Sequence, residues 1–153
     1  VKQPDEFPQA LENAFKEGHE VLIESFMQGR ETACGVVKTK QRKIIMPVTE
    51  IVPKKEFFDY EAKYAGGMSE EITPALMDEE ITSRIQELSS EIYDILGCKG
   101  IVRVDFIVTK EGPRFLEINT VPGMTKESII PRQAEAFGVS LTDLYSMVVE
   151  DLF

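Results

Sequence analysis

Apolar residues recur at helical spacing in several segments of the chain, and each such segment predicts a helix. The longest runs from Asp78 to Leu96 and is followed by Gly97, a residue type that commonly ends helices. Its apolar positions are Ile81, Ile85, Leu88, Ile92, Ile95 and Leu96. Shorter helices are predicted over residues 5–18, with Asp5 as N-cap and Gly18 as the stop, over 129–137, and over 141–153, with Ser140 as N-cap.

Short apolar runs between these helices predict strands over residues 20–26, 31–37 and 43–52. Residues 57–71 carry mixed signals around a Gly-Gly pair, so we expect an irregular, mobile loop there. A hairpin over residues 103–119 completes the set of strands. Elements of these kinds in this order predict an α+β fold, a largely antiparallel sheet with helices packed against it.

The hairpin over residues 103–119 has a register that can be worked out from its turn. Lys110, Glu111 and Gly112 suit a three-residue loop in which the glycine takes a left-handed conformation. Counting back from that loop pairs Thr109 with Pro113, Ile107 with Phe115, Asp105 with Glu117, and Arg103 with Asn119. Because side chains alternate along a strand, the core face would consist of Val102, Val104, Phe106, Val108, Leu116 and Ile118. The polar residues would then share the opposite face.

Two carboxylates placed directly across a strand pair repel each other, so a cation is expected between Asp105 and Glu117. Together with the amide oxygen of Asn119 they offer the hard oxygen ligands that suit Mg²⁺. A solvated polar face neutralised by Arg103 is the alternative, and the pattern alone leaves both open. The Pro-Gly turn that follows exposes backbone N–H groups beside this face. Those groups could form a nest for an oxyanion or a phosphate, with Arg103 as the charged partner.

Charge and composition narrow the classes of function. The chain has 17 basic against 27 acidic side chains, a formal net charge of −10, so we expect no nucleic acid and no membrane surface as partner. His19 is the single histidine, which nearly removes His-based triads and zinc sites with several His ligands. The two isolated cysteines, Cys34 and Cys98, are expected to be reduced thiols of a cytoplasmic protein. No segment approaches the roughly 18 apolar residues that a membrane-spanning helix needs.

Four segments together resemble a known family: EVLIESFMQGRE (20–31), DYEAKY (59–64), RVDF (103–106) and FLEINTVPGMT (115–125). They are similar, in order and over essentially the whole chain, to the C-terminal part of D-alanine–D-alanine ligases, which are ATP-grasp enzymes. The resemblance implies a cytoplasmic, homodimeric parent enzyme that makes a dipeptide for peptidoglycan precursors from D-alanine and ATP with two Mg²⁺ or Mn²⁺. ATP would phosphorylate the carboxylate of the first D-alanine, and the amine of the second would attack that acyl phosphate.

The resemblance also implies roles for residues on the hairpin and the loop after it. Asp105 and Glu117 would bind one metal ion, and Glu117 and Asn119 the second. Arg103 and the backbone N–H of Gly123 would stabilise the oxyanion of the tetrahedral intermediate. Ser128 would hold the carboxylate of the second D-alanine, although the same hydroxyl could simply cap the helix that follows it.

For the nucleotide, the resemblance implies that Glu24 accepts a hydrogen bond from the adenine amino group and that the backbone at Phe26 and Met27 mimics base pairing. Glu31 would bind the ribose hydroxyls. Lys63 would contact the γ-phosphate, and Tyr64 would help to close its loop over the site. Without the resemblance, the two glutamates are surface acids beside a turn and Lys63 is a solvated loop lysine.

The chain departs from the family's pattern in one respect. The Gly/Ser-rich phosphate loop, the ATP-binding lysine before it and the domain for the first D-alanine have no counterpart in residues 1–153. We therefore expect one C-terminal ATP-grasp domain fragment that is inactive alone. The alternatives are another carboxylate–amine ligase, a D-alanine–D-lactate ligase, against which Tyr64 argues, and a non-catalytic acidic binding module.

Overall fold

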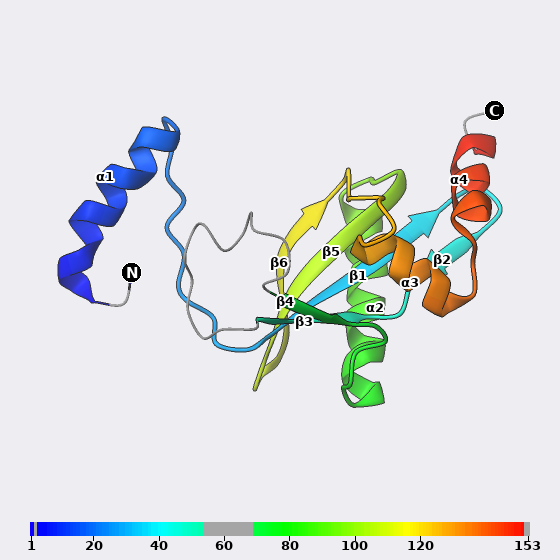
Figure 1. Ribbon diagram of the computed structural model, residues 1–153, viewed down its shortest axis with the longest axis horizontal. Helices are drawn as coiled ribbons and strands as arrows, with labels where there is room; N and C mark the ends of the chain where they lie inside the picture. The colour runs from blue at the N-terminus through cyan, green and yellow to red at the C-terminus, as the bar shows by residue number, and fades with distance from the viewer. Residues whose placement is uncertain (2, 54–68, 152–153) are drawn as a thin grey trace.

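The computed structural model describes residues 1, 3–53 and 69–151, and its centre is a six-stranded antiparallel sheet (Figure 1). The strand order is β4-β3-β1-β5-β6, and β2 pairs with β1 beside β3. The strands are β1 (Arg30–Lys38), β2 (Lys43–Ile45), β3 (Thr49–Pro53), β4 (Ser69–Ile72), β5 (Gly100–Thr109) and β6 (Gly112–Asn119). The α+β class predicted from the sequence is confirmed.

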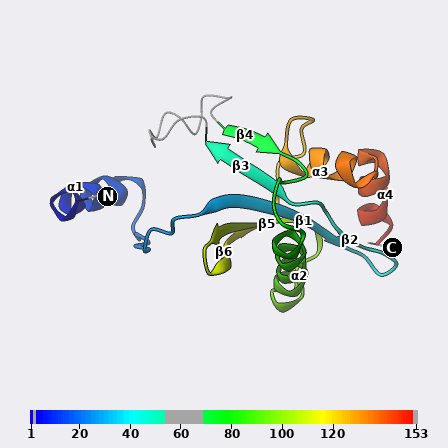
Figure 2. The ribbon, with the colours of Figure 1, turned by 90° about the horizontal axis from the view of Figure 1, so that it is seen from below.

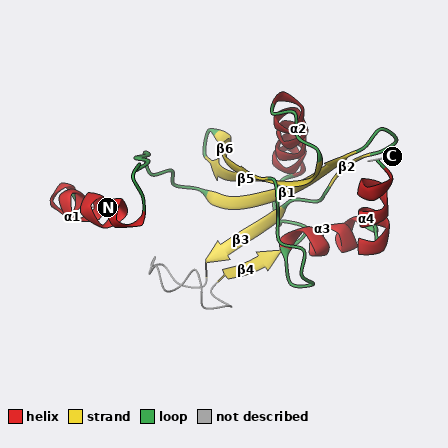
Figure 3. Ribbon diagram, turned by 90° about the horizontal axis from the view of Figure 1, so that it is seen from above, coloured by secondary structure: helices red, strands yellow, loops and turns green. Residues whose placement is uncertain are grey.

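Helices lie on both faces of the sheet, α2 on one and α3 with α4 on the other (Figures 2 and 3). The helices are α1 (Phe7–Glu17), preceded by a 3₁₀ turn (Pro4–Glu6), then α2 (Glu79–Ile95), α3 (Ile129–Phe137) and α4 (Leu141–Glu150). Helix α1 stands apart from the sheet at the end of an extended segment and has no buried residue. Among the described residues, no helix is long and apolar enough to cross a membrane.

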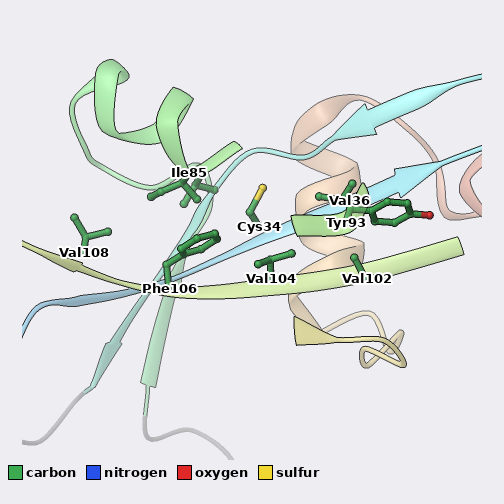
Figure 4. Close-up of a cluster of buried hydrophobic side chains, with 9 residues drawn as sticks. Cys34, Val36, Ile85, Tyr93, Val102, Val104, Phe106 and Val108 are labelled. Atoms are coloured by element: carbon green, nitrogen blue, oxygen red, sulfur yellow. The ribbon is translucent and has the colours of Figure 1, made fainter. Parts of the chain in front are cut away.

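The core between α2 and the sheet follows directly from the alternation in β1 and β5. Every second side chain of these strands points toward α2, where Ile85 and Tyr93 meet them (Figure 4). The cluster consists of Cys34, Val36, Val48, Ile85, Tyr93, Val102, Val104, Phe106 and Val108. The predicted apolar face of β5 is therefore confirmed.

A second core lies between the other face and helices α3 and α4; it contains Val37, Ile44, Met46, Ile130, Ala134, Leu144 and Met147. Helix α3 approaches β1 closely because Gly35 has no side chain. A Cβ at Gly35 would lie 2.7 Å from Gln133 Oε1, from Ile130 Cδ1 and from Met46 Sδ. This close approach places α3 next to the part of the same sheet face that carries Arg103 and Asp105.

Two of the predicted strands are wrong or incomplete. Residues 20–26 are extended but pair with no strand in the described part of the chain, and Leu22, Ile23 and Phe26 are exposed. Residues 43–52 form two strands, β2 and β3, which separate at Met46-Pro47-Val48. Proline has no N–H to donate to a sheet, so it stands where the two strands part.

The loop predicted over residues 57–71 is wrong at its end, because residues 69–71 belong to β4, which pairs with β3. Residues 57–68 lie outside the described residues.

Helix boundaries mostly agree with the sequence pattern. Asp5 is not an N-cap but lies within the 3₁₀ turn, whose N-cap is Gln3, while α1 ends before Gly18 as predicted. Ser140 caps α4 as predicted, since its hydroxyl accepts from the backbone N–H of Asp143 at 3.1 Å. That helix ends at Glu150 rather than at 153, and residues 152 and 153 are outside the described set.

Candidate functional site

The β5–β6 hairpin carries the predicted site, and its register is confirmed where the polar residues lie. Arg103 pairs with Asn119, and Asp105 pairs with Glu117. The predicted pairs nearer the turn are wrong: Thr109 pairs with Gly112, so the connecting loop is only Lys110-Glu111. Gly112 does take the expected positive φ, 110°.

A β-bulge reconciles the shorter loop with the correct polar pairs. Phe106 pairs with Phe115 and Asp105 with Glu117, so Leu116 is an extra residue on β6. Leu116 was predicted to face the core, and this is wrong: its side chain is on the exposed side, while Ile118 still packs against the core. The bulge thus places the apolar side chain of Leu116 at the surface, next to the carboxylates of Asp105 and Glu117.

The centre of the site is a fork of hydrogen bonds between Arg103 and Asp105. The Arg103 Nε donates to Oδ1 at 2.8 Å and Nη2 donates to Oδ2 at 2.7 Å. The Asp105 side chain is 6% exposed and that of Arg103 is 22% exposed, so the pair is largely shielded from water. The hydrogen bond to Asp105 raises the pKa of Arg103, which burial opposes and the charges of Asp105, Glu117 and Glu31 support.

Glu31 joins this face from the neighbouring strand β1. Its pairing with Ile107, and that of Ala33 with Asp105, put Glu31 and Asp105 on the same face of the sheet. The start of β1 is held by Arg30, whose Nε and Nη2 donate to the two carboxylate oxygens of Glu50 at 2.6 Å each. The face therefore carries three carboxylates, those of Glu31, Asp105 and Glu117, around the guanidinium of Arg103.

The oxygen donors of this face are of the type that a hard divalent cation prefers, and both Asp105 oxygens accept from Arg103. Three carboxylates against one guanidinium leave an excess of negative charge, and Mg²⁺ prefers carboxylate and carbonyl oxygens. Asn119 Oδ1 accepts from the backbone N–H of Val121 at 3.0 Å, which aims the amide into the following turn. Within the described ranges, no three His, Cys, Asp or Glu side chains are gathered closely enough to hold a metal ion unaided. Substrate phosphates would have to supply the remaining ligands.

The loop after β6 is tied together by Ser128, the residue before α3. The hydroxyl of Ser128 accepts from the backbone N–H of Thr125 at 3.2 Å and lies 2.9 Å from Thr125 Oγ1. A Cβ at Gly123 would lie 2.9 Å from Ser128 Oγ, so the two predicted site residues are neighbours. Ser128 is the N-cap residue of α3 by position, but its side chain makes no capping bond to that helix. Its hydroxyl organises the loop instead.

The predicted adenine contacts lie in a cleft of about 570 Å³ between α1, the extended segment 21–27 and the hairpin. Glu24, Phe26 and Met27 line it on one side. On the other side are Ile107 and Leu116, two residues that the sequence pattern did not assign to the site. Leu116 reaches the cleft because of the bulge. No spacing of residues in the sequence predicts this bulge. The cleft therefore has the apolar walls that a flat aromatic base requires.

Two predicted site residues, Lys63 and Tyr64, lie outside the described residues. Glu31, Arg103, Asp105, Glu117 and Asn119 are together on one face, with Gly123 and Ser128 in the loop that leaves it.

Comparison with known proteins agrees with this fold. Residues 1–150 match the family model described as D-ala D-ala ligase C-terminus. The whole chain is 49% identical over 154 residues to the D-alanine--D-alanine ligase of Bacteroides fragilis and 47% identical to that of Phocaeicola vulgatus. Each alignment covers 47% of the relative, so the chain spans about half the length of these ligases.

Solved structures show the same architecture. The VanG D-Ala:D-Ser ligase from Enterococcus faecalis superposes with a TM-score of 0.87 and 35% identity, over 99% of this chain and 44% of that one. The D-alanine--D-alanine ligase from Bacillus anthracis complexed with ATP gives 0.79 and 33%, over 99% and 48%. The α+β sheet is thus of the class found in these ligases. The chain belongs to the family of D-alanine–D-alanine ligase C-terminal domains.

Proposed function

We propose that this chain forms the C-terminal half of an ATP-dependent ligase that joins two D-alanines through an acyl phosphate for peptidoglycan precursor synthesis. The parent enzyme would be a cytoplasmic homodimer. The relatives named D-alanine–D-alanine ligase, 47–49% identical over the whole chain, support the substrate.

The observation that carries the proposal is the pairing of Asp105 with Glu117 and of Arg103 with Asn119 on one face of the hairpin. Asp105 and Glu117 would hold one Mg²⁺, and Glu117 and Asn119 a second. When bound, these ions draw negative charge from the phosphate that is transferred. Arg103 is held by Asp105 with its guanidinium charged, so it can stabilise an oxyanion without taking up a proton.

The adenine would occupy the cleft lined by Glu24, Phe26, Met27, Ile107 and Leu116. Glu24 would accept from the amino group, and the backbone at Phe26 and Met27 would bond the ring edge. Glu31 would bind the ribose hydroxyls, because it lies on the face that joins the cleft to the carboxylates. Burying one face of the base against Ile107 and Leu116 would contribute to the affinity for the base.

The acceptor would be held in the loop between β6 and α3. The hydroxyl of Ser128 would bind the carboxylate of the second D-alanine, and the backbone N–H of Gly123, next to it, would stabilise the oxyanion. Lys63 would contact the γ-phosphate and Tyr64 would help to exclude water; both assignments rest on the resemblance of residues 59–64.

A second candidate activity differs only in the acceptor. The similarity to the VanG D-Ala:D-Ser ligase, with a TM-score of 0.87, favours D-serine as the alternative second substrate. Competition between D-alanine and D-serine in the full-length enzyme would separate the two by the product ratio.

The central test replaces the carboxylates one at a time. In the full-length ligase that carries this chain, Asp105→Asn and Glu117→Gln should each lower D-alanine-dependent ADP release by about 10²-fold or more, because each removes a charge that holds the phosphates. Glu111→Gln is the matched control, since Glu111 is an exposed acid in the turn of the same hairpin. Thermal melting would establish that each variant is folded.

Near-normal turnover of Asp105→Asn or Glu117→Gln at low Mg²⁺ would refute the proposed metal ligands. A loss of the same size in Glu111→Gln would show that any change of charge on the hairpin matters, and the specific assignment would then fail as well.

A further inference from the structure

Two adjacent residues of α3 fasten this helix to the sheet. Gln133 is fully buried; its Nε2 donates to the Ala33 carbonyl oxygen and to Thr49 Oγ1, each at 2.9 Å. Its Oε1 accepts from the backbone N–H of Gly35 at 2.9 Å. These bonds attach α3 to β1 and β3, at the place where β2 and β3 part.

Arg132 makes the second attachment, to the edge strand β4. Its Nη1 donates to Glu71 Oε2 at 2.9 Å, and its Nη2 donates to the backbone carbonyl oxygen of Glu71 at 2.7 Å. Both hydrogen bonds run from the guanidinium of Arg132 to the same residue, Glu71. They therefore fix the orientation of the Arg132 side chain as well as its distance from β4. The side chains are 38% and 24% exposed, so water screens the charge attraction and the pair has little value for stability alone.

Arg132 lies one helical turn from Ser128 and so from the loop between β6 and α3, which is assigned to the acceptor. The backbone N–H of Arg132 donates to the carbonyl oxygen of Ser128 at 3.4 Å. Ser128 in turn bonds Thr125 and stands against Gly123. A continuous series of contacts therefore runs from Glu71 through Arg132 and Ser128 to Gly123. Because α3 has only nine residues, the place of its first turn depends on these anchors.

We propose that Arg132 is a positioning residue for the second substrate. By holding the first turn of α3 against β4, it fixes where the Ser128 hydroxyl and the Gly123 N–H stand relative to Arg103 on the sheet. It touches no substrate and acts through Ser128. The inference rests on the proposed function, and it adds a residue whose effect is confined to the acceptor.

The test measures the two D-alanine sites and ATP separately in the full-length enzyme. Arg132→Met keeps the length of the side chain and removes the fork. It should raise the KM for the second D-alanine by about tenfold, since small displacements of a positioning group are costly. The KM for ATP and for the first D-alanine should stay within about twofold, because these ligands do not rely on the Ser128 loop. Arg132→Lys, which restores the charge and one bond, should recover part of the loss.

Two further variants keep the result interpretable. Glu71→Gln retains the backbone bond and a neutral acceptor, so it should fold normally and raise the same KM by about threefold. Arg84→Met is the matched control, because Arg84 forms an exposed ion pair with Glu87 on α2, on the other face of the sheet. It should change none of the three constants.

An unchanged KM for the second D-alanine in both Arg132→Met and Glu71→Gln, or an equal rise in all three constants, would overturn the positioning role. If the wild-type enzyme showed no D-alanine-dependent ADP release, the proposed function itself would fail, and this inference with it.

Discussion

The buried amide of Gln133 should be among the most costly side chains to replace in this domain. Gln133→Leu keeps nearly the same volume but removes three hydrogen bonds, to the Ala33 carbonyl, Thr49 Oγ1 and the Gly35 N–H. Thr49 keeps its bond to Thr73 Oγ1 at 2.6 Å, so two backbone groups lose their partner. Each orphaned buried group costs about 1–3 kcal/mol, which sums to roughly 2–6 kcal/mol before any gain from the added apolar surface.

Urea unfolding would measure this loss. With an m-value of about 2 kcal/mol/M, the middle of the range for small proteins, the midpoint should fall by roughly 1–3 M at an unchanged slope. Gln86→Leu is the matched control, because Gln86 makes a single bond, to the Met46 carbonyl at 2.9 Å, from a half-buried site. That variant should lose about 1 kcal/mol or less.

The reasoning would be refuted if Gln133→Leu and Gln86→Leu lost the same free energy. Equal losses would mean that water enters beneath α3 and satisfies Gly35 and Ala33, and that the helix is not sealed against β1 there. Hydrogen exchange at the Gly35 amide gives an independent check, since its protection should drop only in Gln133→Leu.

Two more predictions concern neighbouring residues of β1 that face opposite sides of the sheet. Gly35→Ala should destabilise the domain by about 1–3 kcal/mol, seen as a lower urea midpoint, because its Cβ would lie 2.7 Å from three side chains of the α3 face. Burial raises the pKa of Cys34 from 9.0 to about 12, so between these values the unfolded chain ionises first. Stability should therefore fall with rising pH by up to about 1.4 kcal/mol per pH unit. Cys34→Ala should make this slope shallower, and the part that remains comes from groups such as Tyr93, whose pKa is also raised by burial. An unchanged slope would contradict the role of Cys34.

The elements whose signals are local could be predicted from the sequence. The three-to-four spacing of α2, the Ser140 cap of α4 and the alternation of β5 each depend on residues close together in the chain, so pattern was enough. The pairing of Asp105 with Glu117 was also predicted, although by a route that was partly wrong. A loop one residue too long and a missed bulge at Leu116 cancelled at the polar pairs.

Features that depend on a partner distant in the chain become visible in the folded structure alone. Residues 20–26 have strand composition, but a strand exists only where another one pairs with it, and none does so in the described residues. The bulge that turns Leu116 toward the adenine cleft is a property of two strands together, and neither strand encodes it alone. The attachments of Gln133 to β1 and of Arg132 to β4 join residues 61 to 100 positions apart. No local pattern encodes such pairs, because the position of α3 depends on how its whole face packs against the sheet.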